Sequence, residues 1–377
     1  MRFKKTFRLV FVNFGVFLFF LGFAEIISRV YEAISPESQY QHRLQQQISQ
    51  ERLEDSSCKS PPIITDSGNL SRYSEDFSCD GITIQDGLRL TVDSPVNPSK
   101  TIHVFGGSTV FGTGSKDGET IPSYIQKILN SNGLNVAVKN YGFMTLVASQ
   151  QLAALKAANL RIGDIVLFYD GGNDAFNSFV YGSPEGTIIG YNRNNRIAFA
   201  LVKARHYLQL NSALYRSLGA LKADISGKNS PSDAQCSEIP NDSSQDSYVN
   251  HYFGVLADAK SYAKSKGAQF FHSFQPILGS SNGLSKDESS RLLELLNVDG
   301  IARCTQENLL SYYSKLSENY DKYLREVNGL NLSNVFAGST SSFSARYIDW
   351  IHMTPVANKK IAEKLMHHMS SSPNSLQ

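Results

Sequence analysis

Residues 164–174 read Asp-Ile-Val-Leu-Phe-Tyr-Asp-Gly-Gly-Asn-Asp, which is an unbroken apolar run followed by a glycine-rich polar segment. Apolar residues without alternation are typical of a strand that is covered on both faces. Gly-Gly-Asn-Asp is typical of a turn. We therefore predict a buried strand over Asp164–Tyr169 that ends in a polar loop at residues 170–174.

The same order of strand, turn and helix continues on both sides of this stretch. Further strands are predicted at Ile102–Phe105, Val136–Val138, Ala268–Phe274 and Asn334–Phe336. Helical spacing or composition predicts helices at Thr120–Asn130, Val147–Leu160, Ala198–Ala223, Tyr248–Lys266, Lys286–Leu296, Gln306–Glu326 and Val356–Met369. This alternation indicates an α/β fold with a parallel sheet covered on both faces. In such sheets, functional residues gather at the carboxyl ends of the strands.

Polar segments divide the chain into four predicted parts. They are a basic end and apolar helix at 1–34, a polar stalk at 35–99, a compact domain at 100–369 and a disordered tail at 370–377. The stalk includes a short exposed helix at Leu44–Leu53. An insertion at about 175–250 interrupts the domain, with loops at Ala175–Asn195 and Ser226–Ser247.

Composition narrows the class of protein. The chain has 377 residues, of which 41% are hydrophobic and 19% charged, so it is not disordered. Its net charge is +2, but four basic residues precede the first apolar run, and the remainder carries 32 basic against 34 acidic residues. No basic stripe interleaved with aromatic residues occurs, and we therefore predict no nucleic-acid partner.

The first apolar run predicts export. Leu9–Ala24 contains one polar residue, Asn13, and its extension to Ile27 gives a helix of roughly 28 Å, about one hydrocarbon core. The basic residues precede it, so the N-terminus is expected in the cytoplasm and the domain in the periplasm or outside the cell. The helical pattern continues past Ala24, which favours an uncleaved signal-anchor. Gly22-Phe23-Ala24 leaves a cleaved signal peptide open, and a buried core helix is a third interpretation.

Export permits disulfides among the four cysteines, Cys58, Cys79, Cys236 and Cys304. Four cysteines allow three pairings, and the short loop favours Cys58–Cys79. Four free buried thiols are the alternative. No Cys-x-x-Cys pair occurs, so we predict no cysteine-built zinc site.

Three polar segments carry the residue types of nucleophilic catalysis. Ser108 follows a predicted strand between small residues, where its hydroxyl and N–H are exposed at the sheet edge; a phosphate-binding turn or a plain loop fits the same letters. Asn173 can donate to an oxyanion or form an ordinary Asx turn. Asp349 and His352 are three residues apart, so the carboxylate can hold Nδ1–H and leave Nε2 as a base. A chance surface turn is the alternative for this pair.

Together and in this order, Ser108, Gly142, Asn173 and the Asp349-x-x-His352 pair resemble the SGNH hydrolase (GDSL-like esterase/lipase) superfamily. That family carries a serine in its first block, a glycine in its second, an asparagine in its third and Asp-x-x-His in its fifth. The resemblance covers about residues 100–369. It implies a three-layer α/β/α sandwich with a central parallel sheet.

The resemblance also implies roles. Ser108 would be the nucleophile, His352 the general base and Asp349 the residue that orients His352. The N–H groups of Ser108 and Gly142 and the side-chain amide of Asn173 would form the oxyanion hole. The first block reads Gly-Gly-Ser-Thr instead of Gly-Asp-Ser-Leu. The missing aspartate is not a triad member, so the departure changes the subfamily and leaves activity expected.

Other candidates have simpler interpretations. His103 and His272 lie in predicted strands and are interpreted as packed core residues. Gln275 follows the fourth strand and is a candidate for the pocket lining. No His, Asp and Glu set has metal-ligand spacing, so we expect neither a metal nor another cofactor. Four tyrosines of the insertion suit stacking on sugar rings, or simple packing: Tyr181, Tyr191, Tyr207 and Tyr215.

The sequence thus predicts a membrane-anchored serine ester hydrolase that removes an acyl group, such as acetyl, from a carbohydrate or small ester. An acyltransferase to a cell-surface polysaccharide would use the same site, because only the access of water to the acyl-enzyme separates the two. A lipase is a further variant of the same chemistry. A non-catalytic module that binds glycan or organises an envelope assembly is the alternative from another class.

Overall fold

The structure is a computed structural model that describes residues 20–30, 63–65, 71–73, 75–181, 184–185, 242–278, 280, 303–337 and 346–372. The chain divides into two compact units; residues 20–30 belong to the first, and the other described ranges belong to the second. Several predictions lie outside these ranges. They concern the helices Leu44–Leu53, Ala198–Ala223 and Lys286–Leu296, most of the insertion at 175–250, and the tail from residue 373.

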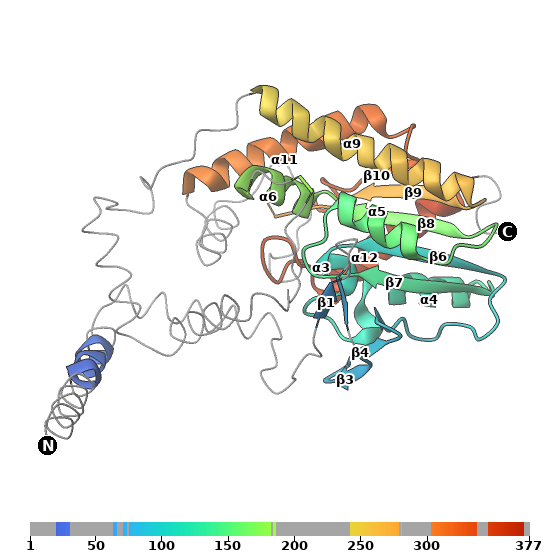
Figure 1. The fold of residues 1–377 in the computed structure, drawn as a ribbon. Helices are drawn as coiled ribbons and strands as arrows, with labels where there is room; N and C mark the ends of the chain where they lie inside the picture. The colour runs from blue at the N-terminus through green and yellow to red at the C-terminus, as the bar shows by residue number, and fades with distance from the viewer. Residues whose placement is uncertain are drawn as a thin grey trace, which may run out of the picture. The chain divides into compact units, whose positions relative to one another are not determined.

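An eight-stranded sheet in the order β10-β9-β8-β6-β7-β5-β4-β3 forms the centre of the second unit (Figure 1). The parallel strands are β6 (Lys100–Gly106), β7 (Val136–Gly142), β8 (Ile165–Asp170), β9 (Gln269–Phe274) and β10 (Gly329–Asn331). Every residue of β8 is buried, as its apolar sequence predicts. The predicted α/β architecture is confirmed, with a central sheet that is mostly parallel instead of wholly parallel.

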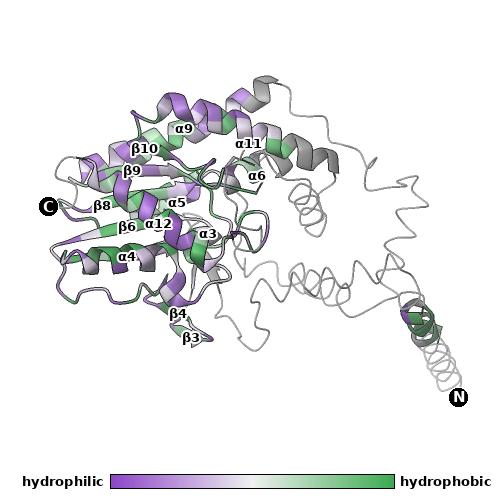
Figure 2. Cartoon of the chain, turned by 180° about the vertical axis from the view of Figure 1, so that it is seen from behind, coloured by the Kyte–Doolittle hydropathy of each residue, from purple (hydrophilic) through white to green (hydrophobic). Residues whose placement is uncertain are grey.

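Helices cover both faces of this sheet. On one face, which Figure 2 shows in front, α4 (Ile121–Ser131) packs against α12 (Pro355–Ser370). On the other face, α5 (Ala148–Ala157) packs against α9 (Asp242–Ser265), and α11 (Arg303–Tyr323) lies beside α9 (Figure 1). Both α4 and α12 begin with a threonine cap and a proline in the first turn, a combination typical of helix starts.

The sheet is not wholly parallel, and the compact part of the chain begins before Lys100. β3 (Phe77–Cys79), β4 (Ile82–Gln85) and β5 (Leu88–Arg89) extend it in antiparallel fashion beside β7, so the prediction of a stalk over 35–99 is wrong for these residues. The missed signal is a pair of Asp-Gly turns. Asp80-Gly81 and Asp86-Gly87 all have positive φ and connect directly paired strand ends. Such turns match the twist of a hairpin.

Two further pieces belong to this N-terminal extension. β1 (Ile63–Thr65) and β2 (Ser71–Tyr73) form a separate two-stranded antiparallel sheet. Cys79 at the end of β3 is disulfide-bonded, so the alternative of a free thiol is wrong for this residue. Cys58 lies outside the described residues, and the Cys58–Cys79 pairing stays a prediction.

Three boundaries also differ from the prediction. Residues 175–181 belong to α6 (Gly172–Tyr181) and residues 242–247 to α9, where loops were predicted. α6 packs against α11, and this tertiary contact outweighs the turn propensity of the Gly-Asn-Asp sequence at its start. The last strand was predicted at Asn334–Phe336, but these residues form a turn. The last strand of the structure is β10, in which Gly329 pairs with His272 of β9.

Residues 20–30 form a helix whose large apolar side chains are exposed. Phe20, Phe23 and Ile26 are 61%, 54% and 60% exposed, and Glu25 and Arg29 form an ion pair of 2.9 Å one turn apart. The first part of the predicted anchor, residues 9–19, lies outside the described residues. Within the described ranges, no helix combines the length and hydropathy needed to cross a membrane.

Candidate active site

The loops that follow β6, β7, β8 and β9 meet at one edge of the sheet. Gly106 at the end of β6 pairs with Gly142 on one side and Tyr169 on the other, and Asp170 pairs with Phe274. From β6 the chain first moves to β7 and then returns to β8 on the opposite side. This is the topological switch point, where α/β sheets place their ligands.

Ser108 lies at this switch point. It begins the one-turn helix α3 (Ser108–Phe111) directly after β6 and Gly107. Among the described residues, its backbone N–H donates no hydrogen bond, as expected for the first residue of a helix. A Cβ at position 107 would stand 2.2 Å from Nδ2 of Asn173, so glycine here lets that amide approach the Ser108 turn. Ser108 therefore offers both a hydroxyl and a backbone donor at the sheet edge.

His352 reaches Ser108 from a loop 244 residues later. Its Nε2 lies 2.6 Å from Oγ of Ser108, and its Nδ1 lies 2.6 Å from Oδ2 of Asp349. The side chain of His352 is 16% exposed and that of Asp349 is 3% exposed. A buried carboxylate on Nδ1 fixes the neutral tautomer with its lone pair on Nε2, which then accepts the hydroxyl proton of Ser108.

A tight loop holds Asp349 and His352 in this arrangement. Oδ1 of Asp349 accepts the N–H groups of Ile351 and His352, at 2.9 and 2.8 Å. Tyr347 and Met353 form an antiparallel bridge across the base of the loop. Trp350 stacks on Phe176 of α6, with ring centroids 5.5 Å apart. Both oxygens of Asp349 are thus used, one to shape the loop and one to hold the imidazole.

Asn173 lies in the first turn of α6, close to Ser108. Its Nδ2 donates to the carbonyl of Leu146 at 3.1 Å, which uses one of its two protons. The approach of Nδ2 to Gly107 places this amide beside the Ser108 turn. The second Nδ2 proton remains for an acceptor at the sheet edge.

The structure does not offer the N–H of Gly142 as an oxyanion donor. This N–H donates to Oδ1 of Asn140 at 2.8 Å, and Nδ2 of Asn140 donates to the carbonyl of Val110. A Cβ at position 142 would stand 2.1 Å from the N atom of Phe111, so close packing against α3 requires glycine here. Gly142 thus has a packing function in this chain, in place of the oxyanion-donor role that the resemblance implies.

A donor that the sequence did not indicate lies three residues further on. Thr145 has φ +58°, a left-handed conformation that costs a β-branched residue free energy. Its N–H donates no hydrogen bond within the described part of the chain. The next residue, Leu146, has its carbonyl beside Gly107 and bonded to Asn173. The Thr145 N–H therefore belongs to the loop that borders Ser108.

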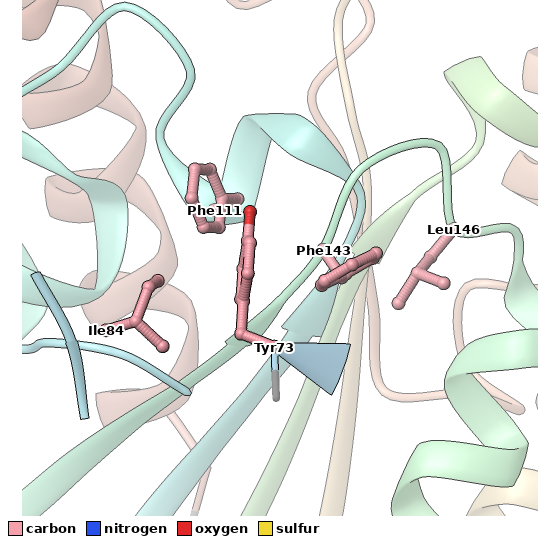
Figure 3. Close-up of a cluster of buried hydrophobic side chains, with 5 residues drawn as sticks. All are labelled: Tyr73, Ile84, Phe111, Phe143 and Leu146. Carbon is pink, nitrogen blue, oxygen red and sulfur yellow. The ribbon is translucent and has the colours of Figure 1, made fainter. Parts of the chain in front are cut away.

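A buried aromatic cluster supports both this loop and α3. In Figure 3 the ring of Tyr73 stands between Phe111 of α3 and Phe143, with Leu146 beyond Phe143. The centroid of the Tyr73 ring lies 6.0 Å from that of Phe111 and 5.2 Å from that of Phe143. Ile84 of β4 completes the cluster. The N-terminal extension thus packs under the Ser108 turn.

The buried residues Asp170 and Asp174, which flank Asn173 in the sequence, belong to a polar network. Oδ1 of Asp170 accepts from the Tyr252 hydroxyl at 2.6 Å and lies 2.8 Å from Nε2 of His272. Oδ1 of Asp174 accepts the N–H of Ala148, which ties α6 to the start of α5. Burial and then the charge of Asp170 raise the pKa of Asp174 well above its usual value.

This raised pKa makes the stability of the protein depend on pH. Above the usual aspartate range, the unfolded chain has released the Asp174 proton while the folded chain still holds it, so stability falls as the pH rises through that window. Asp174→Asn keeps the oxygen that accepts from Ala148 and removes the titration. We expect the free energy of unfolding of the variant, taken relative to that of the wild type, to increase by about 1.4 kcal/mol per pH unit within the window.

Chemical denaturation at a series of pH values from 4 to 8 measures this gain. Asp246→Asn is the control, because the Asp246 side chain on α9 is 63% exposed. Parallel pH profiles for Asp174→Asn and the wild type would show that Asp174 titrates normally in the folded protein.

The remaining histidines of the strands are core residues, as predicted. His103 is 1% exposed, and its Nε2 lies 3.1 Å from Oδ2 of Asp164; burial lowers its pKa in spite of this partner. His272 is fully buried. Among the described residues, no group of three or more His, Cys, Asp or Glu side chains is placed to hold a metal ion.

No protein-family model matches the chain, and no curated protein matches it significantly. Solved structures do resemble it. A lipolytic protein of the G-D-S-L family from Veillonella parvula has 12% identity and a TM-score of 0.39 over 73% of this chain and 100% of its own. The lipase/acylhydrolase from Enterococcus faecalis has 11% identity and a TM-score of 0.36, over 72% of this chain and 95% of its own.

An acetylxylan esterase from Geobacillus stearothermophilus, Axe2, is similar to the same extent. It has 12% identity and a TM-score of 0.35, over 72% of this chain and 95% of its own.

Proposed function

We propose that this chain is a serine ester hydrolase of the SGNH type. The observation that carries the proposal is the hydrogen-bonded series from Ser108 Oγ through His352 to Asp349, with 2.6 Å at each step. A serine hydroxyl is a weak nucleophile at neutral pH unless a base takes its proton. Here the base is in contact with the hydroxyl and its orienting carboxylate is buried.

The first half of the proposed reaction forms an acyl-enzyme. Oγ of Ser108 attacks the ester carbonyl carbon while Nε2 of His352 takes the hydroxyl proton, and the carbonyl oxygen becomes an oxyanion. As the tetrahedral intermediate collapses, the bond to the alkoxy oxygen breaks. The His352 imidazolium then gives its proton to the leaving alcohol. Asp349 stabilises the imidazolium throughout.

The second half releases the acid. Water attacks the acyl-Ser108 carbonyl while His352 again acts as base, and the proton returns to Oγ of Ser108 when the second tetrahedral intermediate collapses. An acceptor hydroxyl in place of water would complete an acyl transfer by the same steps.

Three donors would stabilise the oxyanion. They are the N–H of Ser108, the second Nδ2 proton of Asn173 and, in place of Gly142, the N–H of Thr145. Among the described residues, the N–H of Ser108 and the second Nδ2 proton of Asn173 have no acceptor, and both lie beside the Ser108 hydroxyl. Thr145 is held in a strained conformation on the adjoining loop. Preorganised donors of this kind stabilise charge that develops in the transition state.

The proposal extends to the location and the substrate. The exposed apolar side chains of residues 20–30 support a membrane-anchoring N-terminal helix, with the catalytic domain outside the cytoplasm. Residues 168–174, Phe-Tyr-Asp-Gly-Gly-Asn-Asp, together with the N-terminal apolar helix, resemble exported bacterial members of the superfamily that act near cell-surface polysaccharides. This resemblance supports a short acyl group, such as acetyl, on a carbohydrate.

Hydrolysis of p-nitrophenyl acetate and p-nitrophenyl butyrate by the full chain in detergent tests the proposal. We expect turnover that depends on Ser108 and is faster with acetate. Faster turnover of butyrate would contradict the short acyl group. No release of p-nitrophenol, even with a glycan that carries free hydroxyl groups as the acyl acceptor, would contradict the hydrolase and favour a binding module.

Asn173→Ala tests the oxyanion role. We expect kcat to fall by about 10²- to 10³-fold with little change in KM, because the contact strengthens only in the transition state. Asn177→Ala is the matched control: it lies one turn further on α6, where its Nδ2 donates to the carbonyl of Asn173 at 2.9 Å. Its kcat should stay within about two-fold of the wild type. A change confined to KM for Asn173→Ala would contradict the role.

A further inference from the structure

Gln275 lies directly after β9, and both its backbone N–H and its backbone carbonyl are hydrogen-bonded. Its N–H donates to the carbonyl of Asp170 at 2.8 Å, and its carbonyl accepts from the hydroxyl of Tyr313. The residue is 2% exposed. The backbone of Gln275 is therefore fixed to the end of β8, and its side chain has one well-defined direction.

The side chain of Gln275 lies between the Ser108 turn and the Asn173 turn, in each case beside the chain neighbour of a proposed catalytic group. Its Oε1 accepts from the hydroxyl of Thr109, the neighbour of Ser108, at 3.1 Å. Its Nε2 lies 2.3 Å from where a Cβ on Gly172 would stand, and Gly172 precedes Asn173. The position of that Cβ on Gly172 is also 2.8 Å from Cδ1 of Ile351, which precedes His352.

This amide is placed at a cost to stability. Nε2 of Gln275 is buried and has no hydrogen-bond partner among the described residues. A buried donor without a partner is unfavourable, and a leucine would fill a similar volume without that penalty. Gly172 must also lack a side chain to admit the amide. A residue that opposes stability in this way points to a functional requirement.

We propose that Gln275 is a positioning residue that keeps the Ser108 turn aligned with the Asn173 turn through its bond to Thr109 and its contact with Gly172. This rests on the proposed function, since the alignment matters for attack on a bound ester. Small misplacements of a nucleophile relative to its electrostatic partners lower kcat strongly. The substrate contacts are unchanged, so KM should be affected little.

A double-mutant cycle tests this proposal in the full chain. Gln275→Leu and Thr109→Val each remove one partner of the bond at nearly constant volume, whereas Thr109→Ser keeps the hydroxyl. We expect kcat to fall about 10- to 100-fold in Gln275→Leu and in Thr109→Val, with KM within two-fold. The double variant should lose no more than the worse single variant, and Thr109→Ser should retain most of the wild-type kcat.

Folding is followed in the same samples by the emission of Trp350, the single tryptophan of the chain, which lies in the Asp349–His352 loop and stacks on Phe176. Wild-type emission with lowered kcat supports positioning. Unchanged kcat in Gln275→Leu, losses that multiply in the double variant, or a loss confined to KM would each overturn the inference. If the wild type shows no Ser108-dependent turnover, the proposed function fails and this inference with it.

Discussion

Ser108→Ala removes ester turnover almost completely, with an expected fall in kcat of about 10⁴- to 10⁶-fold. Removal of the nucleophile of a hydrogen-bonded triad costs about as much as removal of the whole triad, because its members act as a unit. The hydroxyl makes its described hydrogen bond to His352 alone, so its loss leaves the loop around Asp349 intact. The steady-state kcat for p-nitrophenyl acetate, with the melting temperature of the same sample, measures the effect.

The chain supplies a matched control for this variant. Oγ of Ser149 lies 2.9 Å from Nε2 of His251, so α5 and α9 carry a second Ser–His contact. The Nε2 atom of His251 also lies 3.5 Å from Oε1 of Glu185, and among the described residues no carboxylate holds its Nδ1, so this contact lacks the arrangement of the Ser108–His352–Asp349 series. Ser149→Ala should leave kcat within about two-fold of the wild type. Full activity in Ser108→Ala, or equal losses in both variants, would contradict the proposed nucleophile.

The residues that meet in the candidate active site were predictable because local sequence determines them. Strand-forming segments followed by glycines place Ser108 and Asn173 at strand ends, and parallel strands bring their ends to one edge. Asp349 and His352 are three residues apart, so a single tight turn joins them. These features need no knowledge of distant contacts.

The features that the sequence did not show depend on distant contacts. Gly142 has the position of a donor in the family pattern, but its N–H is taken by Asn140 and its Cα packs against α3. The positive φ of Thr145 is unusual for threonine, and propensity argues against it. Gln275 becomes informative only when Thr109 and Gly172 are seen on either side of it.

Asp349→Asn is expected to lower kcat by about 10⁴-fold while the loop keeps its shape. The asparagine oxygen can still accept the N–H groups of Ile351 and His352, which Oδ1 of Asp349 accepts now. The new NH₂ group would face Nδ1 of His352 in place of Oδ2. A donor at this point favours the tautomer that carries its proton on Nε2, and that tautomer cannot take the proton of Ser108.

Asp164→Asn separates this effect from the general cost of altering a buried Asp–His pair. Oδ2 of Asp164 lies 3.1 Å from Nε2 of His103, and its side chain is 1% exposed, so its loss should lower the melting temperature. Asp164 directly precedes β8, at the end of the strands opposite Ser108, so kcat per folded molecule should remain near the wild-type value. If Asp349→Asn keeps kcat within ten-fold, or if Asp164→Asn loses as much, then the carboxylate on Nδ1 does not set the tautomer for catalysis. A large fall in kcat with unchanged KM and melting temperature in Asp349→Asn alone is the result that only the tautomer argument predicts, because a merely structural role for Asp349 would lower stability as well.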